Sequence, residues 1–292
     1  MQDALQDQDD TLLKALTGLE GGCVANGSTC GIASGGALGI ALKHEQYLQQ
    51  DDPQMEAFVL NAAGQYMDWF RETHGTTRCW DRNHVDFQKI TGQLRYFLSA
   101  QKIMRCITMA GRSIQYLTSE NHVGDFRDAT ATEKMQSCSP VHCAQEVLKL
   151  VHSKTSIGNK RLERLSIVLD GGIGLRGALC GALAGAILSL NLVHGFNLRQ
   201  MSYGTNIKKF LIGHINLIRK KPGRNQDTFS IGKQLVNRFR EQAGSIECSI
   251  ITGRQFHDME DFNRHMENSD ICKDLIHASA VLAAEAIQQT SI

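Results

Sequence analysis

The residues whose type and spacing point most clearly to chemistry are the cysteines, of which the chain has nine in 292 residues. Four of them lie far apart in the second half, at Cys143, Cys180, Cys248 and Cys272. Four thiolates brought to one point could hold a [2Fe–2S] cluster or a zinc ion. The same thiols could instead form two dithiol/disulfide pairs, or simply pack as small hydrophobic groups with no metal bound. No CxxC occurs, which excludes a thioredoxin-like site and a zinc-ribbon knuckle.

An internal repeat places some of these cysteines in matching surroundings. With a shift of 150 residues, residues 19–42 (LEGGCVANGSTCGIASGGALGIAL) coincide without a gap with residues 169–192 (LDGGIGLRGALCGALAGAILSLNL). Cys30 then falls on Cys180, and most of the glycines coincide as well. Such self-similarity predicts two tandem copies of one structural unit.

Two further cysteine pairs follow in the same order. A shift of 169 matches WFRETHGTTRCW with RFREQAGSIECS and places Cys79 on Cys248. Cys106 and Cys272 share an offset of 166, each inside a helical pattern. The helix expected to begin near Cys143 has no counterpart, because that counterpart would fall before the first residue. The first copy is therefore predicted to lack its opening cysteine helix and to be a degenerate, structural partner.

The predicted architecture is an all-α helical bundle of two tandem, internally repeated modules, residues 1–128 and 138–292. Few prolines and aromatics, together with periodic apolar positions, favour helices throughout. Ser139 and Pro140 are expected to open the Cys143 helix, and residues 121–136 to connect the modules. Helices are expected near residues 9–20, 29–44, 53–73, 84–118, 139–153, 160–170, 177–194, 200–218, 230–243 and 268–288.

Composition excludes some partners. Lys and Arg number 31 against 30 Asp and Glu, which argues against a nucleic-acid binder or a general binder of anionic membranes. The most apolar segment, residues 178–193, is too short to span a membrane, so no membrane is expected as a partner. No signal peptide opens the chain, so we expect a cytoplasmic, reducing compartment. The basic stretch 219–224 (RKKPGR) is expected to be a solvated turn, with docking of an acidic redox partner protein as the sharper alternative.

CGALAG (residues 180–185) resembles the CGAxxG signature of the redox-active C_GCAxxG_C_C family, whose members are small bacterial modules. The family pattern has one cysteine upstream of this motif and two downstream, which Cys143, Cys180, Cys248 and Cys272 fit. In the first copy CGIASG (residues 30–35) is a looser match. A related domain occurs in an unusual haem cytochrome associated with a non-haem iron centre. The resemblance therefore implies redox activity, and kinship implies an iron–sulfur centre.

Other motifs are weaker evidence for a function. Glycines at 172, 174 and 177 spell GxGxxG after the strand-like residues 166–170, but no acidic residue follows until Asp227, so the match is treated as incidental. Gly171, Gly172 and their neighbours are expected to form a flexible loop that leads into the Cys180 helix. His142, next to Cys143, is expected to be packed or solvated rather than a ligand. No CxxCH motif for covalent haem is present.

The sequence thus favours a redox-active protein, an electron-transfer or redox-sensing chain whose second module binds an iron–sulfur or other metal centre through Cys143, Cys180, Cys248 and Cys272. A weaker candidate set in the first module is Cys23, Cys30, Cys79 and Cys106. The alternatives are a thiol–disulfide oxidoreductase using the same thiols and a metal-free structural or interaction protein. Fusion of two copies further suggests that the modules pack as a pseudo-dimer.

Overall fold

The computed structural model describes residues 2–3, 5–50, 52–119, 141–218 and 228–289. Within these residues the chain is helical, with no strands and only two isolated β-bridges, which confirms the all-α class. The first half contains α1 (Asp10–Leu16), η1 (Thr17–Leu19), α2 (Gly31–Lys43), α3 (Glu45–Leu48), α4 (Pro53–His74), α5 (Cys79–Asn83), α6 (Ile90–Phe97) and α7 (Ala100–Thr118).

The second half contains α9 (Cys143–Thr155), α10 (Lys160–Leu165), η3 (Ser166–Leu169), α11 (Gly181–His194), α12 (Tyr203–Ile218), α13 (Thr228–Ala243), α14 (Cys248–Thr252), α15 (Met259–Asn268) and α16 (Asp270–Gln289). Helices α11, α13, α14, α15 and α16 follow one another as α2, α4, α5, α6 and α7 do. Helix α12 has no counterpart in the first half. None of the helices described is both long and apolar enough to cross a bilayer.

The single helix predicted over residues 84–118 is wrong, because the chain breaks twice there. His84 ends α5 with a left-handed backbone, φ 49°. Ser99 separates α6 from α7 and accepts a hydrogen bond from the Lys102 amide, as an N-cap does. The apolar periodicity continues through both breaks, so the pattern alone could not show them.

The helix predicted to open at Ser139 begins later, at Cys143, with His142 as the N-cap residue. Ser139 and Pro140 lie outside the described residues, as do Cys138, the predicted connection 121–136 and the basic stretch 219–224. The amide of Cys143 donates instead to the carboxylate of Asp170, 2.8 Å away and 27 positions along the chain. A helix start capped from so far away cannot be recognised from neighbouring residues.

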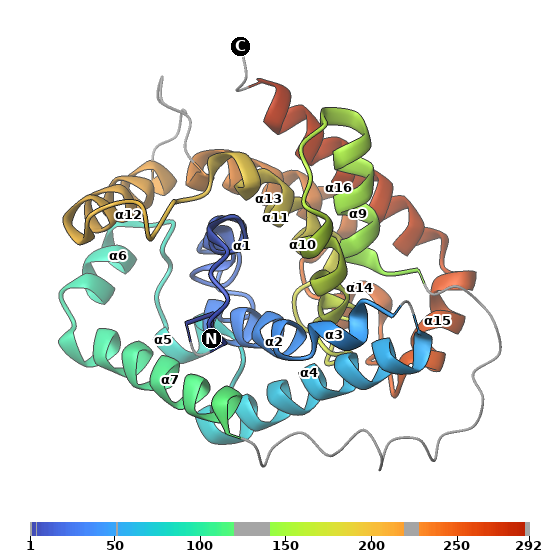
Figure 1. Ribbon diagram of the computed structural model, residues 1–292. Helices are drawn as coiled ribbons and strands as arrows, with labels where there is room; N and C mark the ends of the chain where they lie inside the picture. The colour runs from blue at the N-terminus through green and yellow to red at the C-terminus, as the bar shows by residue number, and fades with distance from the viewer. Residues whose placement is uncertain (1, 4, 51, 120–140, 219–227, 290–292) are drawn as a thin grey trace.

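Helices α2 and α11, which begin at the first glycine of CGIASG and of CGALAG, form the centre of the molecule (Figure 1). Helix α11 packs against α9, α16 and α13, and every residue from Gly181 to Asn191 is buried. Its glycines and alanines allow these neighbours to approach closely. Helix α2 packs against α4 and α7 in the same way.

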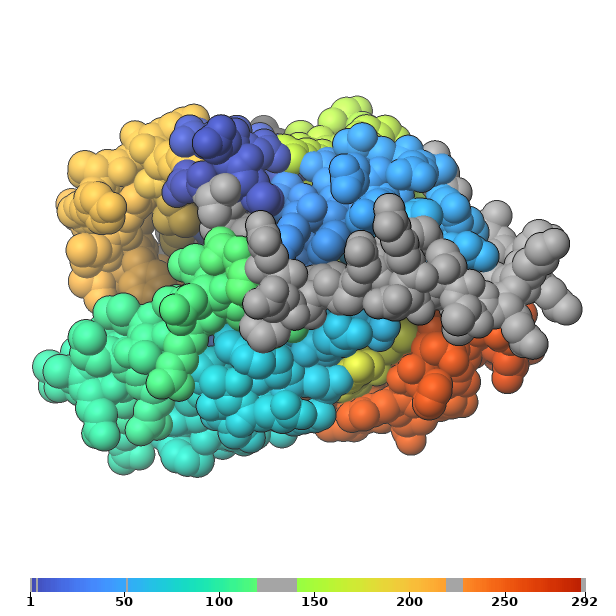
Figure 2. Space-filling model, turned by 60° about the horizontal axis from the view of Figure 1, so that its bottom comes forward, coloured from blue at the N-terminus to red at the C-terminus, as the bar shows by residue number. Residues whose placement is uncertain are grey.

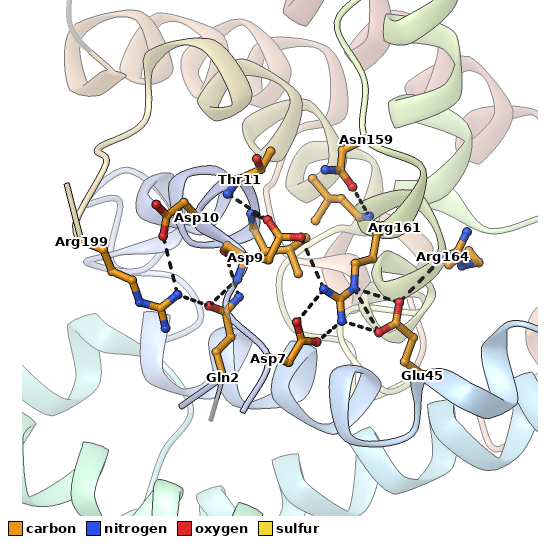
Figure 3. Close-up of polar contacts among 12 residues, drawn as sticks. Gln2, Asp7, Asp9, Asp10, Thr11, Glu45, Asn159, Arg161, Arg164 and Arg199 are labelled. Atoms are coloured by element: carbon orange, nitrogen blue, oxygen red, sulfur yellow. Dashed lines mark hydrogen bonds and ion pairs between the residues drawn. The ribbon is translucent and has the colours of Figure 1, made fainter. Parts of the chain in front are cut away.

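Helices of each half pack against helices of the other half. Helix α1 and η1 of the first half pack on α11, while η3 of the second half packs on α2 and α4. Figure 3 shows the polar contacts that join the N-terminal segment to the second half. Arg161 of α10 binds Asp7 and Glu45, with 2.9 Å between its Nε and the Glu45 carboxylate, and Arg199 binds Asp3 at 2.7 Å. The halves therefore share one continuous core rather than touching only at their surfaces.

Candidate functional site

Backbone pairing brings two of the predicted cysteines together in the second half. The amide of Cys180 donates to the carbonyl of Ile246 at 2.9 Å, and the amide of Cys248 donates to the carbonyl of Ala178 at 2.7 Å. These bonds flank the isolated bridge between residues 179 and 247. Cys180 is the N-cap of α11 and Cys248 the first residue of α14. The pairing thus fixes two helix starts, each with a cysteine, side by side.

The turn before Cys180 is left-handed. Residues 171–175 all have positive φ, between 56° and 76°, and two of them, Ile173 and Leu175, are not glycine. Backbone hydrogen bonds join the turn to η3, including Gly174 N to Val168 O at 2.8 Å. Left-handed geometry costs roughly 1–2 kcal/mol for each non-glycine residue, and such strain persists only where the surroundings enforce it. The prediction of a flexible loop here is therefore wrong, because the turn is buried and hydrogen-bonded.

Glycines of the CGALAG motif bring α9 close to α11. A Cβ built on Gly181 would lie 3.0 Å from the Cβ of Cys143, and one on Gly185 would lie 2.7 Å from the carbonyl oxygen of Ala144. Both glycines are therefore required for the approach of α9, which places Cys143 beside Cys180.

A buried charge network holds the start of α9. Asp170 is fully buried, and its second carboxylate oxygen lies 2.6 Å from Nδ1 of His142. Nε2 of His142 faces Glu56 of the first half at 3.3 Å. Burial alone would lower the pKa of His142, but the carboxylates of Asp170 and Glu56 outweigh it and raise the pKa to about 9. The histidine is packed, as expected, and it orients α9 from behind Cys143.

The four predicted cysteines of the second half line one small cavity. Its volume is about 20 Å³, room for roughly one water molecule. The thiols come from four different helices, α9, the start of α11, α14 and α16. The cavity is lined by Cys143, Gly171, Cys180, Gly181, Ala182, Cys248, Ile251, Thr252, Phe256, Phe262, Met266, Cys272 and Leu275.

The cavity is electrostatically unusual for thiols, because no lysine, arginine or histidine lines it. Burial raises the pKa of all four thiols, that of Cys180 to about 11, although the amides of Leu183 and Ala182 partly oppose the rise there. Cys272, the most exposed of the four, lies 3.6 Å from Nε2 of His265. Reactive cysteines normally have a nearby cation that stabilises the thiolate. Burial therefore disfavours the thiolate form of all four cysteines.

The donor set is chemically that of an iron–sulfur centre. Four thiolates are the ligands that such a cluster takes, and the apolar wall keeps water from them. Within the described residues, however, no three His, Cys, Asp or Glu side chains are close enough to hold one metal ion. A cluster would have to enlarge the cavity, and Met266, 3.9 Å from Cys143, is a flexible part of its wall.

The first half repeats part of this arrangement. The amide of Cys30 donates to the carbonyl of Thr77 at 2.7 Å and that of Cys79 to Ser28 at 2.8 Å, around a bridge between residues 29 and 78. Burial is the main cause that raises the pKa of Cys79, and the nearby thiols of Cys30 and Cys106 raise it further. Cys106 therefore lies near this pair.

Cys23 does not join that group. It is fully buried in a left-handed turn, φ 66°, and the charges that act on it, those of Glu247, Arg240, Glu20 and Cys180, include none from Cys30, Cys79 or Cys106. No described helix takes the position of α9 beside α2. The first half thus brings three of its four candidate thiols together, and all eight described cysteines of the chain are free.

Sequence reasoning missed Asp170 and the handedness of its turn. One signal was present: the repeat aligns LDGG with LEGG, so Asp170 falls on Glu20. An acidic residue kept before paired glycines in both copies indicates a position that a carboxylate must occupy.

Comparison with known proteins adds one finding. The family model described as "Putative redox-active protein (C_GCAxxG_C_C)" matches residues 1–119 and again residues 141–286. The chain belongs to this family. The two matches confirm that this C_GCAxxG_C_C protein consists of two tandem copies of the family unit. No curated protein and no solved structure gives a significant match.

Proposed function

We propose that this redox-active protein transfers or senses single electrons through an iron–sulfur centre held by Cys143, Cys180, Cys248 and Cys272. The observation that carries the proposal is the convergence of these four thiols, from four separate helices, on one apolar cavity. When bound, such a centre would supply a one-electron couple. The protein's own residues hold the thiols in place and exclude water from them.

Charge favours a metal centre over dithiol exchange. Exchange begins with a thiolate, and no cation among the cavity-lining residues would stabilise one. A metal centre brings positive charge with it and deprotonates its thiol ligands. Asp170 is buried nearby and raises the pKa of Cys143 further, which adds to the cost of a bare thiolate.

The first module would act as a structural partner. It supplies Glu56 to the network behind Cys143, and α1 to the surface of α11. These contacts support a pseudo-dimer in which one half completes the support of the other's site. A redox partner protein would exchange electrons at the side of Cys272, whose thiol is the most accessible of the four.

The test is electron paramagnetic resonance and visible spectroscopy on protein purified without oxygen, before and after reduction with dithionite. The proposal predicts visible charge-transfer bands that bleach and a paramagnetic signal that appears on reduction. Colourless protein that binds no iron after reconstitution with iron and sulfide would contradict it. If that protein lost two titratable thiols on mild oxidation, the thiol–disulfide function would replace the proposal.

A further inference from the structure

Basic residues are concentrated at one end of the molecule, far from the neutral balance of the whole chain. Residues 87–119, which include α6 and α7, contain five lysines and arginines and no aspartate or glutamate. Residues 195–218, which include α12, contain three and again no acidic residue. Helices α6 and α12 are in contact, and Figure 2 shows α12 (tan) above α6 and α7 (green) at the same end of the molecule.

The corresponding helix of the second half has the opposite charge. Helix α15 occupies the place of α6 in the repeat and carries Glu260, Asp261 and Glu267. Among described residues, Arg95, Lys208 and Lys209 of α6 and α12 form no ion pair. The positive charge of α6 and α12 is therefore not a general feature of the repeat, and it is available to a partner.

The same two helices also expose long aliphatic side chains. Ile90 and Leu94 of α6 are 58% and 52% exposed, and Ile207 and Ile215 of α12 are 59% and 50% exposed. Exposure of this many large apolar residues on two adjacent helices is unusual for a surface that meets only water. Helix α12 is moreover an insertion without a counterpart in the first half, and it contributes no residue to the thiol cavity.

A groove of about 590 Å³ runs between the two helices, within the size range of pockets that bind small molecules. Its apolar wall is formed by Ile90, Leu94, Phe97, Leu211, Ile215 and Ile218. None of the residues that line this groove is acidic, and both helices that form it carry exposed cations. Such a groove matches a molecule with an apolar chain and an anionic head. A basic amphipathic surface helix with exposed aliphatic residues has the pattern of helices that lie in a membrane interface.

We infer that α6 and α12 dock this protein on an anionic membrane surface, with lipid chains against the groove and lipid headgroups beside Lys208, Lys209 and Arg95. This contact lies in the plane of the interface, so it needs no membrane-spanning helix. Complementary charge identifies the occupant, since each basic residue near an anionic bilayer contributes about 1 kcal/mol and the aliphatic side chains add burial in the interface. The inference is independent of what the four thiols bind.

The experiment is co-sedimentation of the full chain with vesicles of phosphatidylcholine alone or mixed in equal parts with phosphatidylglycerol. Wild type should bind the mixed vesicles and release them as salt is raised. Lys208→Glu combined with Lys209→Glu should weaken binding at least about tenfold. Leu94→Ser combined with Ile215→Ser should weaken it by about tenfold through lost apolar burial. These side chains are exposed, and an unchanged circular dichroism melting curve would verify folding.

The matched control is Lys149→Glu combined with Lys154→Glu, a charge reversal of equal size at exposed positions on α9. Its binding should equal that of wild type within about twofold. Absence of wild-type binding, equal binding to both vesicle types, or equal loss in the control and in the Lys208/Lys209 variant would each overturn the inference. Self-association without vesicle binding, abolished by Leu94→Ser with Ile215→Ser, would assign the face to a second copy of this chain instead.

Discussion

In α11, Gly185 lies against the backbone of α9, where an added Cβ would be 2.7 Å from the carbonyl oxygen of Ala144. In α2, Gly35 occupies the same position of the repeat, and an added Cβ would meet no described atom within 4 Å. The two modules thus keep the same central helix and the same left-handed turn. They differ in that the cysteine-bearing helix α9 packs on α11, whereas no described helix takes that place on α2.

The backbone framework and the complete thiol set are therefore separate features of the fold. The carboxylate of the turn is kept in both modules, as Asp170 and as Glu20, and each faces a buried histidine. In the second module that histidine is His142, which precedes Cys143. In the first it is His214, 3.8 Å from Glu20, and it belongs to the inserted α12. The carboxylate of the first module thus has a histidine partner that comes from the second half of the chain. Among the described residues, no fourth thiol is placed there in the same way.

The largest effect is expected from the two carboxylates. Asp170→Asn removes the charge that holds the buried His142 and weakens the cap of α9, so we expect a loss of about 3 kcal/mol in the free energy of unfolding. Glu20→Gln should cost less than about 1 kcal/mol, because the Glu20 side chain is 27% exposed and 3.8 Å from His214. Urea unfolding of both variants at neutral pH measures the difference. Equal losses would show that the modules depend on their carboxylates alike.

Replacing the corresponding glycines should change the free energy of unfolding by a smaller amount, and in opposite directions in the two modules. Gly185→Ala should destabilise by about 2 kcal/mol, because its methyl group would press on the backbone of α9. Gly35→Ala should stabilise by about 0.5–1 kcal/mol, the usual gain of alanine over glycine in a helix where the added methyl group meets no neighbour. Thermal or urea unfolding of the pair is sufficient. Destabilisation by Gly35→Ala would mean that a helix does pack there.

The smallest effect concerns a feature that the modules share. Burial and Lys43 lower the pKa of His44, at the end of α2, to about 4, and burial likewise lowers that of its counterpart His194. A histidine with a depressed folded-state pKa stabilises the fold above pH 6.5, and this contribution is lost as pH falls towards 4. We expect His44→Gln to reduce the loss of stability over that interval by about 1 kcal/mol, allowing for partial exposure. Urea unfolding at several pH values would check this, and a pH dependence equal to that of wild type would contradict it.

The extent to which the sequence predicts this molecule depends on the range of the interactions. The repeat predicted the two copies, because it compares like positions directly. It could not predict that Asp170 caps α9, because Asp170 lies 27 residues after Cys143, the first residue of that helix. A capping residue is normally expected next to the helix start. Nor could apolar periodicity locate the breaks at His84 and Ser99, where backbone geometry and capping decide. The left-handed conformation of Ile173 and Leu175 opposes their own preference and depends on tertiary packing.

Paired cysteine variants would show whether the second module alone holds the redox centre, as we propose. Iron and acid-labile sulfide would be measured in protein purified without oxygen as wild type, Cys180→Ser and Cys30→Ser, which change the same position of the repeat in the two modules. The account predicts iron and sulfide in wild type, retained in Cys30→Ser and lost in Cys180→Ser. Iron that survives Cys180→Ser, or that is lost only in Cys30→Ser, would contradict it.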